Sequence, residues 1–333
     1  MSCGPIQLSA QQESWPIAGS FTISRGSKTT ADIVIAEVTR GQHRGRGECV
    51  PYPRYNETAA GVLAQIDQLQ SALDPTVEFG RQQLQQLLPA GAARNAVDCA
   101  LWDLESKESG KPVWRLAGLQ QPQPVLTAYT ISLDSAAAMG RVALNNRARP
   151  LLKLKLTGAG DLERVAAIRE NAPAAALIVD ANEGWSVRQL ETVGQRLAEH
   201  GVTLIEQPLP AGADEALASC EHPIPICADE SCHTAADVSS LADRYDVVNI
   251  KLDKTGGLTE ALALQARARS CGLGVMIGCM VSTSLSMAAA FVLANDADFV
   301  DLDGPLLLQR DRQHGMRYED SLIHPPVTNL WGG

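Results

Sequence analysis

The chain has 333 residues and a formal net charge of −10, and this length suits a barrel joined to a smaller domain. The acidic balance argues against a nucleic-acid partner, because neutralising phosphates requires a basic face. No apolar run approaches the roughly 20 residues that span a bilayer, so we expect no membrane association.

The start of the chain and the cysteines bear on the compartment. Residues 1–5 have neither the basic n-region nor the apolar h-region of a signal peptide. The eight cysteines are scattered, without a CxxC pair or a Cys/His cluster. We interpret them as reduced thiols that serve as small core residues, and we therefore expect a cytoplasmic protein.

Strands come first along the chain and helices follow. Apolar and polar residues alternate from residue 7 on, and strands are expected at 33–38 and 45–48, with a polar turn at 24–28. Helical spacing of apolar residues follows over 57–72 and 92–105. Strands followed by helices, without alternation, indicate an α+β domain.

The domain boundaries follow from changes in pattern. We place the α+β domain over residues 1–120, because the Gln- and Pro-rich segment 118–124 is typical of a linker. After residue 309 the alternation of strands and helices is lost, and we expect the tail 309–333 to pack back on the first domain. The segment between them, 121–308, forms the second domain.

This second domain repeats a unit of strand and helix. Helical segments such as 161–170 and 188–200 separate short apolar runs. Eight runs are counted, at 125–131, 151–156, 177–180, 203–206, 224–229, 247–251, 275–278 and 299–303. Alternation at this spacing predicts a parallel sheet of the α/β class, and eight units favour a closed (β/α)8 TIM barrel. In such a barrel the active face lies at the C-terminal strand ends.

Three acids end successive strands of the predicted barrel, namely Asp180, Glu206 and Asp229. Successive strands are neighbours in space, so the three carboxylates should converge at one rim. Hard oxygen ligands without Cys or His nearby suit Mg2+, and without a cation the carboxylates would repel one another. The alternative is that these acids only cap helices or solvate loops.

Three lysines flank the predicted metal ligands. Lys153 and Lys155 are two residues apart on one strand, so both face the same side, and the barrel interior suits them better than the packed helices outside. Lys251 ends a strand on the far side of the acids. Lysines on two sides can move a proton off one face of a carbon and onto the other. The alternative is a set of salt bridges between these lysines and the acids.

Such a site would deprotonate a carbon next to a carboxylate, giving a dianionic enediolate. A dication about 4 Å from one enediolate oxygen supplies on the order of 8 kcal/mol at an effective dielectric near 20. Lys153 beside the other oxygen adds roughly half of that. Neighbouring cations also push the pKa of a lysine base down, in the direction that catalysis needs.

The lysine pair, the three acids and Lys251 stand in an order that resembles the enolase superfamily, in its muconate-lactonizing-enzyme subgroup. The resemblance covers nearly the whole chain and implies a modified barrel with an α+β capping domain. It implies that Lys155 and Lys251 exchange the proton while Lys153 and Mg2+ stabilise the enediolate, which is an established pattern of that superfamily.

Two further motifs resemble the dipeptide epimerases of this subgroup. Asp301 and Asp303 lie on one face of the eighth strand and suit an ammonium group, as in the epimerases that hold a substrate's free N-terminus. Arg25 resembles the arginine that pairs with a glutamate side chain in Ala-Glu epimerases, and guanidinium suits bidentate carboxylate binding. Taken singly, the aspartates fit a solvated loop and Arg25 a surface charge, but together they fit a dipeptide ending in Glu.

Other positions are assigned by family analogy alone. The runs 47–55, 226–233 and 251–257 also resemble the Ala-Glu epimerases. Thr130 would touch the substrate carboxylate or Lys155, and Cys279 and Met280 would line the pocket. A surrounding layer that orients lysines or water would consist of Asn182, Glu230 and Asp253.

The resemblance implies Mg2+-dependent epimerisation of L-Ala-D/L-Glu at the Glu α-carbon, in the recycling of cell-wall (murein) peptides. Another dipeptide specificity, an N-acylamino acid racemase or an o-succinylbenzoate synthase would use the same lysines, although the last two have little need of Asp301 and Asp303. A metal-free Schiff-base aldolase also uses an inward lysine, and a small-molecule binding protein can keep the fold. The sequence leaves the oligomeric state open, with a homo-oligomer among the alternatives.

Overall fold

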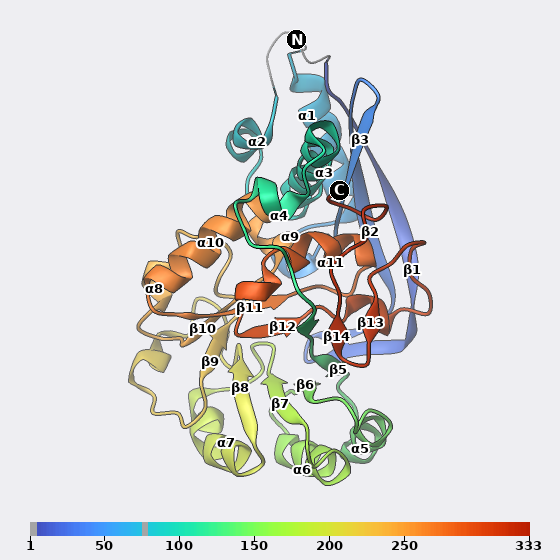
Figure 1. The fold of residues 1–333 in the computed structure, drawn as a ribbon. Helices are drawn as coiled ribbons and strands as arrows, with labels where there is room; N and C mark the ends of the chain where they lie inside the picture. Colours follow the sequence, from blue (N-terminus) through green and yellow to red (C-terminus); the bar gives the residue numbers. More distant parts are fainter. Residues whose placement is uncertain (1–4, 75–78) are drawn as a thin grey trace.

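The structure is a computed structural model that describes residues 5–74 and 79–333. Figure 1 shows an antiparallel sheet with its helices in the upper half and a ring of parallel strands with its helices in the lower half. The predicted α/β class, a modified TIM barrel with an α+β capping domain, is confirmed. None of the helices in the described ranges is both long and apolar enough to cross a membrane.

The upper sheet has the strand order β1-β2-β3 and is antiparallel. Its strands are β1 (Gln7–Ile23), β2 (Gly26–Arg40) and β3 (His43–Cys49). The strands predicted at 33–38 and 45–48 lie within β2 and β3. The predicted polar turn at 24–28 shrinks to Ser24 and Arg25, because ladder pairing extends the β1–β2 hairpin beyond the hydrophobic pattern.

Helices follow this sheet; the first and third of them pack on it, and the second and fourth pack against the third. They are α1 (Ala59–Ala72), α2 (Arg81–Leu87), α3 (Ala92–Ser109) and α4 (Val113–Leu116). Helix α3 lies between the sheet and the barrel and is therefore buried along most of its length. It contacts β3 so closely that a side chain at Gly47 would overlap the Ala96 carbonyl, which explains a glycine in that strand.

Eight parallel strands form the barrel in sequence order. They are β5 (Tyr129–Ile131), β6 (Leu151–Lys155), β7 (Ala176–Asp180), β8 (Val202–Glu206), β9 (Ile226–Ala228), β10 (Val247–Ile250), β11 (Gly274–Gly278) and β12 (Phe299–Asp301). A hydrogen bond of 2.9 Å from the Ala128 amide to the Val300 carbonyl links the first strand to the last. The run predicted as one strand at 125–131 divides, because β4 (Val125–Leu126) pairs outside the barrel.

Helices connect most of the strands. They are α5 (Ala136–Asn145), α6 (Asp161–Asn171), α7 (Val187–Glu199), α8 (Val238–Leu241), α9 (Leu252–Thr255), α10 (Leu258–Ser270) and α11 (Ser284–Phe291). Helix α7 begins at a capping box, in which Ser186 and Gln189 satisfy each other's backbone amides. Between β8 and β9 only a short 3-10 turn, Glu215–Ser219, stands in place of a helix, which departs from a regular barrel.

Two layers of side chains fill the barrel. An apolar layer consists of Ala128, Leu151, Ile178, Leu204, Cys227, Val247 and Met276. Two residues further along four of these strands lie Lys153, Asp180, Glu206 and Asp229. Strand side chains alternate with period two, so these charged groups face the same interior from above the apolar layer. The apolar floor explains why all four are almost completely buried.

The end of the chain returns to both parts. Strand β13 (Tyr318–Glu319) pairs with β14 (Leu322–Ile323), and β14 in turn pairs with β4. The Trp331 indole donates to the Cys99 carbonyl at 3.1 Å, so the last residues lie against α3. Figure 1 accordingly places the C-terminus beside the helices of the upper part.

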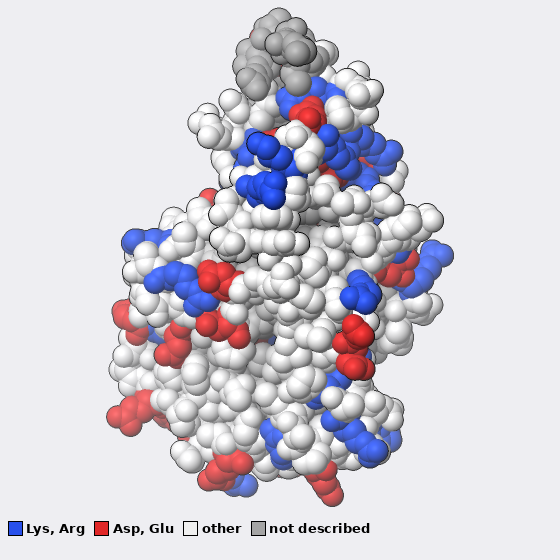
Figure 2. Space-filling view, in the orientation of Figure 1, with Lys and Arg blue, Asp and Glu red and all other residues white. Residues whose placement is uncertain are grey.

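Charge is mixed on the face shown in Figure 2. Basic and acidic side chains are interspersed there over the barrel, with uncharged residues between them. Over the barrel this face therefore presents no continuous basic surface, whereas basic side chains gather on the upper part.

Candidate active site

A cavity of about 610 Å3 opens at the C-terminal ends of the barrel strands, between them and the β1–β2 hairpin. Most of the residues predicted for the site border it, namely Arg25, Thr130, Lys155, Asn182, Asp229, Glu230, Lys251, Cys279, Met280, Asp301 and Asp303. Lys153, Asp180 and Glu206 are also buried at these strand ends but do not line the cavity, and Asp253 faces elsewhere. The hairpin therefore covers a site that the barrel builds.

Lys153 and Lys155 meet the predicted metal ligands directly. The Lys153 ammonium lies 2.6 Å from Glu206 Oε2 and 3.5 Å from Asp180 Oδ2. The Lys155 ammonium lies 2.5 Å from Asp180 Oδ2. One strand thus contributes two cations to the carboxylates of the next two strands, as period-two alternation predicts.

Lys251 approaches the same carboxylates from across the barrel. Its ammonium lies 2.6 Å from Asp229 Oδ2 and 3.9 Å from Glu206 Oε1. Two partners were missed in the sequence: Lys254, 2.7 Å from Asp229 Oδ1, and Asn249, which donates to Glu206 Oε1 at 2.8 Å. The signal for Asn249 was its position two residues before Lys251 on the same strand face.

These ion pairs keep Lys251 protonated. Burial alone would lower the pKa of Lys251, but the carboxylates of Asp229 and Glu206 outweigh it and raise that pKa well above its ordinary value. Burial would raise the pKa of Asp229, but Lys251 and Lys254 hold it well below its ordinary value. As arranged, Lys251 is an ammonium ion, and it can act as a base only when another cation takes over the carboxylates.

The donor set suits such a cation. Within residues 5–74 and 79–333, no three His, Cys, Asp or Glu side chains are positioned as they stand to ligate one ion, since ammonium groups occupy the three acids. The shared ammonium groups nevertheless show that these carboxylates converge, and Asn249 Oδ1 beside them is buried without a hydrogen-bond partner. Carboxylate and amide oxygens alone, without sulfur or imidazole, fit a hard divalent cation such as Mg2+.

Asp301 and Asp303 lie together where the eighth strand ends. Asp301 Oδ2 lies 2.7 Å from the Lys153 ammonium, and its buried Oδ1 has no hydrogen-bond partner in the part of the chain that the structure describes. Asp303 accepts the Thr130 amide at 2.6 Å, and burial with the charge of Asp301 raises the pKa of Asp303 to about 7. Thr130 therefore supports Asp303, and the pair of acids presents negative charge to the cavity.

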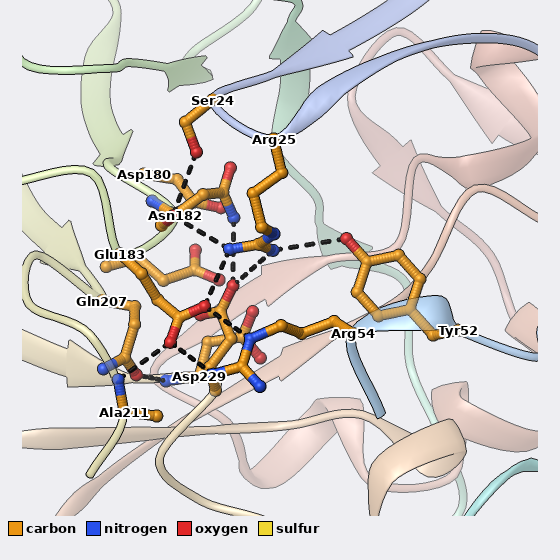
Figure 3. Close-up of polar contacts among 12 residues, drawn as sticks. Ser24, Arg25, Tyr52, Arg54, Asp180, Asn182, Glu183, Gln207, Ala211 and Asp229 are labelled. Atoms are coloured by element: carbon orange, nitrogen blue, oxygen red, sulfur yellow. Dashed lines mark hydrogen bonds and ion pairs between the residues drawn. The ribbon is translucent and has the colours of Figure 1, made fainter. Parts of the chain in front are cut away.

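Arg25 is already engaged by protein groups, as Figure 3 shows. Its guanidinium donates to the Asn182 carbonyl at 2.9 Å, to Glu183 Oε2 at 3.0 Å and to Glu230 Oε1 at 2.7 Å. The Tyr52 hydroxyl accepts a further bond at 3.3 Å. The turn of the hairpin is thereby anchored to the segments that follow β7 and β9.

Glu183 is a partner that sequence reasoning missed. Arg54 donates to both of its carboxylate oxygens at 2.8 Å, and the Ala211 amide donates to Oε1 at 2.8 Å. In Figure 3 Arg25 and Arg54 both point toward Glu183. Asn182 and Glu183 have positive φ angles of 45° and 66°, which sequence patterns do not report for residues other than glycine. This backbone turns Glu183 toward the hairpin.

Two predicted neighbours, Glu230 and Asp253, have other partners than the lysines expected for them, while Cys279 borders the cavity. Glu230 pairs with Arg25 and forms no ion pair with a lysine in the described part of the chain. Asp253 accepts the Val50 amide at 2.8 Å and the Asn95 amide group at 2.9 Å, so it faces the capping domain. Burial raises the pKa of the Cys279 thiol well above its ordinary value, which leaves Cys279 a lining residue and not a nucleophile.

Comparison with known proteins identifies the family. Residues 5–118 match the N-terminal domain of mandelate racemase / muconate lactonizing enzyme, and residues 136–328 match the enolase C-terminal domain-like family. The L-Ala-D/L-Glu epimerase of Escherichia coli (strain K12) is 46% identical over 317 residues, covering 94% of this chain and 98% of that one. An N-acetyl-D-glutamate racemase of a Pseudoalteromonas species is 45% identical over 301 residues, covering 90% and 95%.

Solved structures agree with these matches. An enolase family member from Agrobacterium tumefaciens with homology to dipeptide epimerases, bound to sodium and L-Ala-L-Glu, is 51% identical with a TM-score of 0.93, covering 98% of this chain and 100% of that one. A dipeptide epimerase from Enterococcus faecalis in complex with Mg and L-Leu-L-Tyr is 29% identical with a TM-score of 0.89, covering 100% and 99%. The predicted resemblance is confirmed: this chain belongs to the mandelate racemase / muconate lactonizing enzyme family of the enolase superfamily, and it is an isomerase.

Proposed function

We propose that this enzyme epimerises L-Ala-D/L-Glu dipeptides at the Glu α-carbon by two-base proton transfer. The observation that carries the proposal is the position of Lys155 and Lys251 on one cavity. Their strands, β6 and β10, are four places apart in a ring of eight, so the two side chains enter from opposite sides. A carbon between them can lose a proton on one face and regain it on the other.

Asp180, Glu206 and Asp229 would hold Mg2+, in keeping with the metal-bound relatives. When bound, Mg2+ supplies positive charge that stabilises the enediolate oxygens. With the carboxylates so occupied, Lys155 and Lys251 are free to turn to the substrate. Lys155 takes the α-proton from one epimer while Lys251 protonates the opposite face, and their roles reverse for the other epimer.

The remaining residues orient the dipeptide. Lys153 stays buried beside the acids and adds positive charge at the substrate carboxylate. Asp301 and Asp303 receive the free ammonium group of the first residue, and Arg25 approaches the Glu side chain from the hairpin turn. Such dipeptides are cell-wall fragments, and we assign the enzyme to murein peptide recycling in the cytoplasm on the strength of its family.

Proton NMR in D2O tests this function. L-Ala-L-Glu with enzyme and Mg2+ is expected to lose its Glu α-proton signal while signals of the diastereomer appear. EDTA in excess should stop both changes, and Mg2+ should restore them. Retention of the α-proton signal at high enzyme concentration would refute the proposal, and exchange that persists in EDTA would refute the metal requirement.

A second candidate, racemisation of N-acetylglutamate, is favoured by the Pseudoalteromonas relative at 45% identity. That substrate shares the glutamyl part but has no ammonium group for Asp301 and Asp303. The two functions are separated by comparing kcat/KM for L-Ala-L-Glu and N-acetyl-L-glutamate in the wild type and in Asp303→Asn. A dipeptide epimerase should have the higher kcat/KM for L-Ala-L-Glu. Asp303→Asn should then lower the ratio of kcat/KM for L-Ala-L-Glu over N-acetyl-L-glutamate.

A further inference from the structure

Among the described residues, one lysine that borders the cavity has neither an ion pair nor a hydrogen bond. The sequence contains seven lysines, and five of them form ion pairs with carboxylates within residues 5–74 and 79–333. Lys111 is the sixth and is exposed at the surface. Lys28 is half-buried and borders the cavity, yet its ammonium has no hydrogen bond or ion pair with any residue that the structure describes.

The hairpin aims this lysine into the cavity. Lys28 lies on β2 opposite Phe21 of β1, and alternate residues of β2 after it, Thr30 and Asp32, border the same cavity. The Lys28 ammonium lies 5.9 Å from the Phe21 ring centroid, and the Lys155 ammonium lies 5.8 Å from the same centroid. Both ammonium groups therefore lie by the same ring, which places Lys28 in the part of the cavity that Lys155 also borders.

The position of Lys28 removes water from its ammonium group. Burial lowers its pKa, and the charge of Asp32 offsets this only in part. Asp32 forms no ion pair with it within 4 Å and instead accepts the Ser14 hydroxyl at 2.5 Å. A partly desolvated ammonium without a counter-ion gains most when an anion enters the cavity.

The positive charge of Arg25, unlike that of Lys28, is already neutralised by ion pairs. Two carboxylates, Glu183 and Glu230, already contact its guanidinium. A substrate carboxylate at Arg25 would become a third anion beside those two, whereas at Lys28 it would be the first ion-pair partner. The positive charge without an ion-pair partner at this cavity is therefore that of Lys28 on β2, and not that of Arg25 at the hairpin turn.

We propose that Lys28 binds the side-chain carboxylate of the second residue of the dipeptide and so sets the preference for Glu at that position. This inference rests on the proposed epimerase function. A dipeptide whose ammonium lies at Asp301 and Asp303, and whose α-carbon lies at Lys155, extends its side chain toward the hairpin. The charge of Lys28 then distinguishes Glu from Gln, which has the same shape but no charge.

The test compares L-Ala-L-Glu with L-Ala-L-Gln in the wild type, Lys28→Met and Lys28→Arg. Met keeps the length of the side chain and removes the charge, so the ratio of kcat/KM for Glu over Gln should fall about tenfold or more. Arg should retain most of that ratio. Lys111→Met, which removes one positive charge from the surface, should leave the ratio unchanged.

Equal losses for both dipeptides in Lys28→Met would mean that Lys28 only supports the hairpin, and an unchanged ratio would mean that it does not contact the side chain. Either result overturns the inference. Calorimetric dissociation constants for the same dipeptides separate this test from the proposed function. If the wild type turns over neither dipeptide, epimerisation fails, but a binding preference for Glu that Lys28→Met abolishes still supports Lys28, and no such preference refutes it.

Discussion

At the seam between β3 and α11, Glu48 is buried with both carboxylate oxygens matched. Oε1 accepts the Thr283 amide at 2.8 Å, and Oε2 accepts the Thr283 hydroxyl and the Arg312 guanidinium, the latter at 2.9 Å. Arg312 also contacts Glu13 of β1 at 2.8 Å. Glu48 and Arg312 thus pair with each other and with Thr283 and Glu13, and this network joins the capping sheet to the barrel.

At the barrel mouth the same kinds of group are arranged differently. Lys153 is shared among three carboxylates, while one buried oxygen each of Asp301 and Glu230 has no hydrogen-bond partner within residues 5–74 and 79–333. Partners can be exchanged here when a metal ion or a substrate enters. The difference teaches that burial of charge alone does not mark an active site; incomplete pairing beside a cavity does.

The largest expected effect is a loss of activity at the barrel mouth with little change in the stability of the fold. Lys251→Ala should lower epimerisation by roughly 10³-fold or more, because one of the two acid–base groups is lost. Asp229 keeps Lys254 at 2.7 Å, so the free energy of unfolding should change little. Steady-state kinetics and urea unfolding measure the two effects.

Deuterium exchange sharpens this prediction. With Lys155 intact, Lys251→Ala should still exchange the α-proton of one Glu epimer in D2O without producing the other. Exchange of both epimers at equal rates, or turnover close to that of the wild type, would remove the two-base mechanism.

A substitution at the seam should have the opposite effect, lowering stability while leaving substrate preference unchanged. Arg312→Met leaves Glu48 buried without a counter-ion and should lower the free energy of unfolding by about 3–5 kcal/mol. The double variant Glu48→Gln/Arg312→Met removes the orphaned charge and should recover part of that loss. The kcat/KM ratio for L-Ala-L-Glu over L-Ala-L-Gln in the folded fraction should stay constant, and a changed ratio would show that the seam takes part in specificity.

A pH series tests a second buried acid between the capping domain and the barrel, at the contact of α3 with α10. Burial raises the pKa of Asp98 on α3 to about 6, from 3.8 in the unfolded chain. The folded state therefore binds the proton more tightly, and this contribution to stability is complete below about pH 4 and lost as pH rises through about 6. Asp98→Asn should abolish that loss, which is on the order of 2–3 kcal/mol.

In the wild type the Gln85 amide nitrogen donates to Asp98 Oδ1 at 3.1 Å, and Gln85 Oε1 has no hydrogen-bond partner among the described residues. The Asn side chain fits the site, because it can accept the Thr259 amide and, once the Gln85 amide group turns over, donate to Gln85 Oε1. Unfolding free energies of wild type and variant should therefore diverge between pH 4 and 6 and run parallel above. A difference that does not vary with pH would show that Asp98 is not protonated in the folded state.

Much of the mouth could be predicted from the sequence because its residues follow local rules. Lys153 and Lys155 share a strand face by period-two alternation, and acids at strand ends converge wherever parallel strands are neighbours. The contacts of Arg25 could not be predicted, because its partner Glu183 is 158 residues away and depends on left-handed backbone at that position. The partners of Asp253 could not be predicted for a related reason, since they depend on how α9 packs against α3.

The smallest expected effect concerns Arg25, which belongs to both kinds of cluster. It anchors the hairpin as a matched ion pair, yet it borders the cavity beside Lys28. Because its charge is already balanced, Arg25→Met should lower the ratio of kcat/KM for L-Ala-L-Glu over L-Ala-L-Gln by less than Lys28→Met does. A loosened hairpin should also raise KM for both dipeptides, by up to about tenfold, or 1.4 kcal/mol. A larger fall in the ratio than in Lys28→Met would show that Arg25 releases Glu183 and Glu230 for the substrate, and would make it the main contact of the carboxylate.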